Sequence, residues 1–517
     1  MTSSETTSTV AAGSEATLQH LERRLWDAAN ALRGPVDPSD FKTYVFPVLF
    51  WKWMSDHHAY NHARAVADFG DEDGLVDEEI EADYQQFVIP EGCRWEDVVH
   101  QPLNLGVRIG EALGRIEQAN PDRLANIFGD AAWGNQERLP DSALSGLVQA
   151  FDVLQLTPDR VSNDVLGQAY EYLLKQFADV SGKKAGEFFT PREVVHLLVG
   201  ILDPQEGETI HDPASGSGGM LVETINVVRE RGDEHKSLRL YAQEVNLTTS
   251  AIARMNLFLH EIKDFSVYRG DTLRNPKHKN TDGSLQQFDV TIANPPFSLQ
   301  NWGHEVWADD PRSVSGMPPA KNGDYAWIQH MIATMRPETG RVGVVMPHGV
   351  LFRGGAEGKI RKSLIESDLL EAVIGLPAGL FYSTSIPACI LVFRATKPED
   401  RKDHVLFVDG SARFTKGKNQ NHMTDEDQAM ILEAYKTGVD PDGPDGVKLR
   451  LVSNSEITDN DYDLNLGRYI QTAAEETISV GEAWANYLES RGKRVTAEME
   501  MMTMLSVEGY EVFPWTR

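Results

Sequence analysis

One short sequence combines an asparagine, two prolines and an aromatic residue directly after the apolar segment FDVTIA: Asn294, Pro295, Pro296 and Phe297. An exocyclic amine such as that of adenine is a poor nucleophile, because its lone pair is delocalised into the ring. The Asn294 side-chain oxygen and the Pro295 carbonyl could accept both amine protons and so free the lone pair. The prolines fix φ and remove competing N–H donors, and Phe297 could stack on a flipped-out base. The segment therefore predicts amine-directed group transfer, although Asn-Pro-Pro can also form an ordinary loop.

A glycine-rich segment, DPASGSGG, lies between a predicted strand and a predicted helix. It contains Asp212, Gly216, Ser217, Gly218 and Gly219. Glycines let the backbone approach a ligand closely, and a helix N-terminus offers free N–H groups to an anion. The third glycine of the dinucleotide fingerprint is missing, which argues against a pyrophosphate. The methionine end of S-adenosylmethionine, with a carboxylate and an amine, suits this segment, but a plain strand-to-helix turn fits it equally well.

Two acidic residues follow the next two predicted strands. Glu244 ends the strand in YAQEVN and could accept hydrogen bonds from both hydroxyls of a ribose. Asp271, in GDTL, could accept a hydrogen bond from the amine of a cofactor adenine. The alternatives are a helix cap for Glu244 and an ordinary turn aspartate for Asp271.

Upstream of these motifs, the segment GEFFTPR precedes a helix that we expect to begin near Glu193. Thr190 is expected at its N-cap and Pro191 at its first helical position. The two phenylalanines could belong to the core or to a lid over a cofactor. The lid candidates are Glu187, Phe188, Phe189, Thr190, Pro191 and Arg192.

The first part of the chain has the apolar spacing of helices. We predict helices over 17–35, over 40–58 with a break near Pro47, and over 164–178. These patterns predict a helical N-terminal domain over residues 17–155, preceded by a disordered tail over residues 1–16.

Short β-branched segments then alternate with helical ones, which predicts a parallel, doubly wound α/β sheet. A ten-residue connection is short for a helical crossover, so the last two strands are expected to pair antiparallel. The predicted strands are 208–212, 238–244, 265–270, 288–294, 341–347, 370–377 and 388–395. The predicted catalytic domain covers residues 156–400, and the C-terminal region 401–517 is expected to end in a helical tail over roughly 471–505.

Composition restricts the class of protein. The 517 residues are 41% hydrophobic and contain only two cysteines, so neither a disulfide framework nor a metal site is expected. No signal peptide or membrane span is recognisable, and a cytoplasmic location fits. The net charge is 49 − 78 = −29, whereas binding DNA phosphates requires clustered cations. Either the substrate is not DNA or a partner supplies the basic surface.

In chain order, GEFFTP, DPASGSGG, QEVN, GDTL and NPPF resemble the motifs of the gamma class of amino-methyltransferases. More narrowly, residues 17–470 resemble the modification subunit of type I restriction-modification systems. The resemblance implies an enzyme that methylates the N6 amine of adenine in DNA. It also implies a Rossmann-like S-adenosylmethionine-dependent methyltransferase sheet, an α-helical N-terminal domain and a helical C-terminal tail.

By position, the resemblance assigns 187–192, 217–219 and Glu244 to the S-adenosyl-L-methionine site and 294–297 to the target-base pocket. Asp212, Gly216 and Asp271 join the cofactor site on the argument from the residues alone. The implied partners are duplex DNA, a DNA-specificity subunit shared by two copies of this chain, and a motor-nuclease restriction subunit. The resemblance resolves the charge problem, because the specificity subunit would read the DNA. Alternatives are methylation of cytosine N4 or of a protein glutamine, and a catalytically inactive scaffold subunit.

Overall fold

The computed structural model describes residues 18–71, 75–101, 103–181, 190–381, 386–417, 420–441, 443, 446–470 and 480–507. It divides into one unit that ends at Ile470 and a second that starts at Gln471. The predicted tail over residues 1–16 lies outside the described residues. None of the helices in the described ranges is long and apolar enough to cross a membrane.

The first unit begins with helices that share one hydrophobic core. Residues 18–30 are helical. The elements that follow are η1 Pro38–Asp40, α2 Phe41–Phe69, α3 Glu78–Tyr84, α4 Trp95–Val99, α5 Leu105–Ala119, α6 Pro121–Leu124, α7 Asp141–Asp152 and α8 Asn163–Ser181. The face of α8 predicted from its spacing is buried, with Leu166, Tyr170, Leu173 and Phe177 all in this core. The core also includes residues of α11 (Leu247–Leu259), which joins the helical layer to the sheet.

The predicted break near Pro47 is wrong, because α2 continues through this proline. A proline inside a helix removes one backbone hydrogen bond and costs about 3 kcal/mol. Its neighbours Phe46, Val48, Leu49 and Phe50 are fully buried, and burial of each such side chain contributes about 1.5–3 kcal/mol. The free energy that burial of these four side chains contributes is therefore larger than the cost of the missing hydrogen bond.

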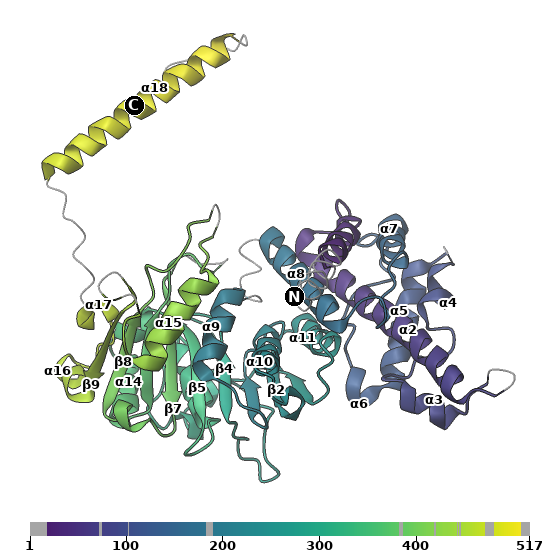
Figure 1. Cartoon of the computed structure of the whole chain (residues 1–517), viewed down its shortest axis with the longest axis horizontal. Helices are drawn as coiled ribbons and strands as arrows, with labels where there is room; N and C mark the ends of the chain where they lie inside the picture. Colours follow the sequence, from purple (N-terminus) through teal and green to yellow (C-terminus); the bar gives the residue numbers. More distant parts are fainter. Residues whose placement is uncertain are drawn as a thin grey trace, which may run out of the picture. The chain divides into compact units, whose positions relative to one another are not determined.

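A nine-stranded sheet forms the second half of the unit, with the order β3-β2-β1-β4-β5-β7-β6-β8-β9 (Figure 1). The strands are β1 Thr209–Asp212, β2 Arg239–Glu244, β3 Phe265–Arg269, β4 Val290–Ala293, β5 Arg341–Pro347, β6 Leu370–Gly375, β7 Ala388–Arg394, β8 His404–Asp409 and β9 Lys448–Ser453. The five strands from β3 to β5 are parallel, and β7 pairs antiparallel with both β5 and β6. All seven predicted strands are confirmed, as is the antiparallel pair.

Helices cover both faces of this sheet. On one face lie α9 Arg192–Leu202, α10 Gly219–Glu230 and α15 Asp425–Thr437. The opposite face is covered by α12 Asp324–Ala333, α14 Ala356–Glu366 and α17 Leu466–Tyr469. Along β5, Val342, Val344 and Met346 pack on the second face while Val345 packs on the first. This alternation with burial on both sides is typical of a doubly wound sheet.

Strands β8 and β9 were not predicted. The segment 404–409 is apolar, but it is short, follows a charged turn and lies in a part of the sequence that is otherwise polar and rich in turn residues. β8 nonetheless pairs parallel with β6, and β9 pairs antiparallel with β8 at the edge. The remaining elements of this unit are η3 His235–Ser237, α11 Leu247–Leu259, η4 His304–Val306, η5 Pro311–Ser313, α13 Gly349–Phe352, η6 Glu399–Arg401 and α16 Asn454–Asp459.

The second unit contains one described helix, α18 Val480–Val507. It matches the helical stretch expected at 471–505, of which residues 471–479 lie outside the described part of the chain. Several of its large apolar side chains are exposed, among them Trp484 at 60% and Met504 at 70%.

Candidate active site

The predicted site residues follow three neighbouring parallel strands. Asp212 ends β1, Glu244 ends β2 and Asn294 directly follows β4, and β1 pairs with both of the other strands. From β1 the strand order runs through β2 and β3 toward one edge of the sheet, and β4 and β5 are then added on the other side of β1. Ligands of doubly wound sheets bind outside the carboxyl ends of the strands at such a point.

The glycine loop after β1 is held against the end of β2. The Gly216 N–H donates to Glu244 Oε2 at 3.1 Å, and the Asn246 N–H donates to Oε1 at 2.8 Å. Gly216 and Gly218 have φ values of 52° and 79°, in the left-handed region that favours glycine. Gly218 is also the N-cap of α10. Glu244 is buried and shapes this loop, in addition to any bond that it forms with a ligand.

Asp212 is fully enclosed. The pKa of its carboxyl is raised to about 8, mainly by burial and in part by the nearby Glu244, although the hydrogen bond from the Ala214 N–H acts in the opposite direction. That N–H donates to Asp212 Oδ1 at 3.0 Å. A cation beside this carboxyl would favour its ionised form.

Asp271 lies in the loop after β3, where its Oδ1 accepts the N–H groups of Leu273 and Arg274 at 3.0 and 3.1 Å. Its other oxygen lies 3.3 Å from Arg274 Nε. The neighbouring Thr272 hydroxyl donates to the Pro213 carbonyl at 2.6 Å. Asp271 therefore stabilises a turn, which was the alternative to a role in cofactor binding. The Thr272 bond connects this turn to the glycine loop.

The Asn294 amide is oriented by a hydrogen bond to Thr190. Its Nδ2 donates to Thr190 Oγ1 at 3.0 Å, and its Oδ1 is buried without a hydrogen-bond partner among the described residues. A buried, unpaired acceptor costs about 1–3 kcal/mol, so a ligand that donates to this oxygen would recover that energy. The Phe297 ring makes an edge contact with Phe381, with centroids 5.9 Å apart.

The expected N-cap at Thr190 is wrong by one residue, because α9 begins at Arg192 with Pro191 in the N-cap position. The Thr190 hydroxyl accepts the bond from Asn294 instead of capping the helix. Glu187, Phe188 and Phe189 lie outside the described residues.

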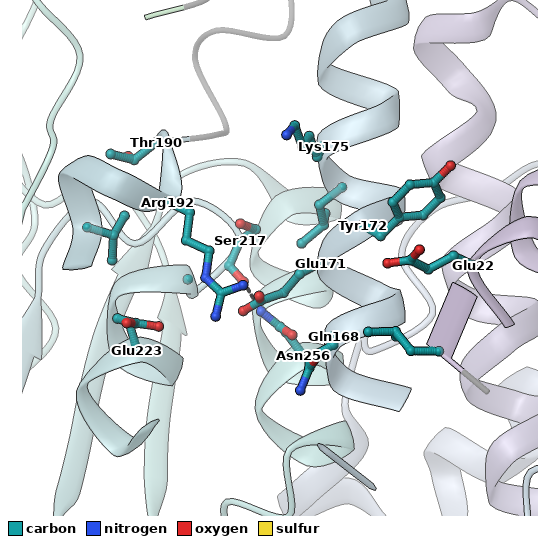
Figure 2. A pocket seen from close by; sticks show the side chains of 14 residues that line it. Glu22, Gln168, Glu171, Tyr172, Lys175, Thr190, Arg192, Ser217, Glu223 and Asn256 are labelled. Atoms are coloured by element: carbon teal, nitrogen blue, oxygen red, sulfur yellow. Dashed lines mark hydrogen bonds between the residues drawn. The ribbon is translucent and has the colours of Figure 1, made fainter. Parts of the chain in front are cut away.

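A pocket of about 290 Å³ borders the glycine loop and the start of α9. Four predicted cofactor residues line it: Thr190, Arg192, Ser217 and Gly219. Figure 2 shows the Arg192 side chain extending into this pocket toward Glu171 and Asn256. The predicted residues therefore form two groups, one around this pocket and one at the strand ends with Asp212, Glu244 and Asn294.

Several polar residues of this pocket were missed by sequence reasoning, among them Glu171 on α8, Glu223 on α10 and Asn256 on α11. Burial raises the pKa of Glu171 to about 7, although the charge of Arg192 lowers it in part. Asn256 donates to the Ser217 carbonyl at 3.1 Å and its Oδ1 has no partner within the described residues. The one sequence feature that could have indicated Asn256 is its position as a single asparagine in the largely apolar segment RMNLFL.

Comparison with known proteins assigns the family. Residues 161–477 match the family model described as N-6 DNA Methylase, and residues 21–151 match the HsdM N-terminal domain. The chain is 33% identical over 427 residues to the type I restriction enzyme MjaVII methylase subunit of Methanocaldococcus jannaschii, covering 78% of this chain and 70% of that protein. It is 35% identical over 361 residues to the HindI methylase subunit of Haemophilus influenzae, covering 68% of this chain and 80% of that protein.

The fold is similar to that of a solved type I restriction-modification methyltransferase subunit from Streptococcus thermophilus. The TM-score is 0.76 at 31% identity, over 88% of this chain and all of that one. The family models together span both the helical layer and the sheet that carries the Asn-Pro-Pro-Phe segment. The chain therefore belongs to the N-6 DNA methylase family, as a methylase subunit of the type I restriction-modification kind.

Proposed function

We propose that this chain transfers a methyl group from S-adenosylmethionine to the N6 amine of an adenine flipped out of duplex DNA. The observation that carries the proposal is the Asn294 side chain, whose Nδ2 is bound by Thr190 and whose buried Oδ1 is unpaired within the described residues. The amide is held with its acceptor available for an amine proton. The Pro295 carbonyl supplies the second acceptor, and Phe297 supplies the stacking surface.

The proposed cofactor site lies beside the proposed target-base pocket of residues 294–297, at the ends of β1 and β2. Glu244 holds the ribose end, and the glycine loop with the N-terminus of α10 holds the methionine carboxylate. Asp212 pairs with the methionine ammonium, and Arg192 lines the neighbouring pocket. S-adenosylmethionine supplies the methyl group. The chain's own residues orient the target amine and accept its protons.

Binding of the cofactor is expected to release a proton from Asp212. In the free protein the pKa of this carboxyl is about 8, so it is protonated at pH 7. An adjacent ammonium lowers that pKa, so cofactor affinity should rise as the pH increases toward 8 and then level off. Calorimetry at pH 7 in two buffers of different ionisation enthalpy measures the proton count. Wild type should release close to one proton and Asp212→Asn close to none; equal counts would show that the ammonium lies elsewhere.

Label transfer tests the proposed reaction. The chain, a DNA-specificity subunit and duplex DNA are incubated with S-adenosylmethionine that carries a tritiated methyl group. The proposal expects label in the DNA and little in protein. Label confined to protein would instead favour methylation of a glutamine side chain, and no label with intact cofactor binding would favour an inactive scaffold subunit.

We further propose that two copies of this chain assemble with one DNA-specificity subunit and, for restriction, with a motor-nuclease subunit. The net charge of −29 opposes binding to DNA phosphates by the chain alone. The exposed apolar residues of α18 offer a surface for such a subunit, and Trp484, Met499 and Met504 are each at least 60% exposed. Flexible methionine side chains suit a packing surface of this kind.

Gel-shift titration tests this division of labour. The isolated chain should bind duplex DNA very weakly at physiological salt, and added specificity subunit should restore tight binding. Tight, sequence-specific binding by the isolated chain would contradict it. A chain truncated after Ile470 should fail to assemble; full assembly by that truncated chain would contradict only the assignment of α18 as the docking surface.

A further inference from the structure

The loop that carries the proposed target-base pocket is anchored by a carboxylate outside all of the predicted motifs. Asp324 is the first residue of α12 and is fully buried. Its Oδ1 accepts the backbone N–H of Ser298 at 2.7 Å. Ser298 directly follows Phe297, so this bond acts on the residue next to the proposed stacking ring.

Ser298 has a φ of 52°, in the left-handed region that a residue with a side chain rarely adopts. This conformation turns the chain sharply after the Asn-Pro-Pro-Phe segment. A residue with a Cβ does not hold such a conformation without surrounding structure that enforces it. The hydrogen bond to Asp324 supplies one constraint, and a second bond from the Gly323 N–H to the Leu299 carbonyl, at 3.0 Å, closes the same turn.

The Asp324 carboxylate is itself held by an ion pair with Arg353 and by its place at the N-terminus of α12. Arg353, just after α13, donates from Nη2 to Asp324 Oδ2 and from Nε to Glu357 Oε2, the latter at 2.6 Å. The side chains of Asp324 and Glu357 are 0% and 3% exposed. Asp324 also lies at the N-terminus of a ten-residue helix, where a negative charge is favoured. A hydrogen bond that a backbone N–H donates to a carboxylate is charge-assisted and therefore stronger than a neutral one.

From this geometry we infer that Asp324 is a positioning residue for the methyl transfer: it fixes the left-handed turn at Ser298 and thereby sets the places of the Pro295 carbonyl and the Phe297 ring. The inference rests on the proposed function of the Asn294–Phe297 loop. The side-chain hydrogen bonds and the ion pair of Asp324 among the described residues go to Ser298, Asn322 and Arg353, and not to Asn294 or a predicted cofactor residue, so its effect is expected on the target base and not on the cofactor.

Two substitutions separate this role from a purely structural one. Asp324→Ala removes both the acceptor and the charge, and should lower the single-turnover rate at saturating cofactor and DNA by about 10- to 100-fold, the range expected for one charge-assisted hydrogen bond. Asp324→Asn keeps an oxygen for the Ser298 N–H and should lose less than Asp324→Ala. Cofactor affinity should stay within about twofold in both. Asp309→Asn, an exposed acid in the same connection between β4 and α12, is the matched control and should retain the wild-type rate.

A second measurement reports on the base itself. A duplex with 2-aminopurine at the target adenine should show a larger fluorescence increase on binding to the Asp324→Ala complex than to wild type, because the displaced Phe297 ring no longer stacks on the flipped base and quenches it. Wild-type rates and fluorescence in Asp324→Ala would overturn the inference, as would a loss of cofactor binding equal to the loss of rate in Asp324→Asn. Asn294→Ala assayed in parallel separates the two claims: if it is inactive while Asp324→Ala is fully active, only the positioning role is wrong.

Discussion

Replacing Asn294 by alanine is expected to lower methyl transfer to DNA by at least about 10²–10³-fold, the effect typical of losing one polar group aimed at the reacting atoms. The substitution removes the buried Oδ1 that has no partner within the described residues. It also removes the donor to Thr190, while the glycine loop and Glu244 keep their bonds. The rate of label transfer from S-adenosylmethionine to DNA measures the effect.

Cofactor affinity is the internal control for this variant and should change by no more than about twofold in calorimetry. Gln300→Ala, at an exposed position in the same loop, should methylate DNA at the wild-type rate. Near wild-type activity in Asn294→Ala would show that the Asn-Pro-Pro-Phe segment does not hold the reacting amine.

Introducing aspartate at Gly218 is expected to abolish detectable S-adenosylmethionine binding. The new carboxylate stands at the N-terminus of α10, where the ligand's own carboxylate is proposed to bind, and the two charges repel. The added Cβ would itself lie in van der Waals contact with α11, with Ala253 Cβ at 3.4 Å. Calorimetry should detect no binding, while circular dichroism should show the helical content retained.

Strain is a separate consequence of this substitution, since Gly218 has a φ of +79° and a left-handed conformation costs a residue with a Cβ about 1–2 kcal/mol. Gly207 has the same φ of +79°, and a Cβ added there meets nothing within 4 Å. Gly207→Asp therefore matches the strain without touching the glycine loop. It should bind the cofactor normally; equal loss of binding in both variants would show that strain, and not the position of the ligand, explains the result.

The central sheet was predictable because its strands are buried on both faces, which gives short β-branched segments such as 341–347 and 388–395. Seven strands and the antiparallel pair were confirmed on that basis. Local rules failed where tertiary contacts outweigh them. Pro47 remains inside α2 because its neighbours are buried, β8 pairs with the edge of β6, and β9 pairs in turn with β8.

Only those residues of the candidate site that lie at the ends of strands could be predicted to be close to one another. Asp212, Glu244 and Asn294 could be placed near one another from the order of strands and helices alone. Contacts between distant segments could not, because no local pattern encodes them: the bond between Thr190 and Asn294 spans 104 residues. The pairing of Asp324 with Ser298 depends on the same kind of long connection.

Mass spectrometry of nucleosides tests the central claim most directly. Duplex DNA is incubated with this chain, its specificity subunit and S-adenosylmethionine, digested to nucleosides and compared with DNA treated with the Asn294→Ala complex. N6-methyldeoxyadenosine is expected as the modified nucleoside in the wild-type sample and should be lost from the variant sample. N4-methylcytosine in place of the methylated adenine, or unmodified DNA from an assembled complex with bound cofactor, would contradict it.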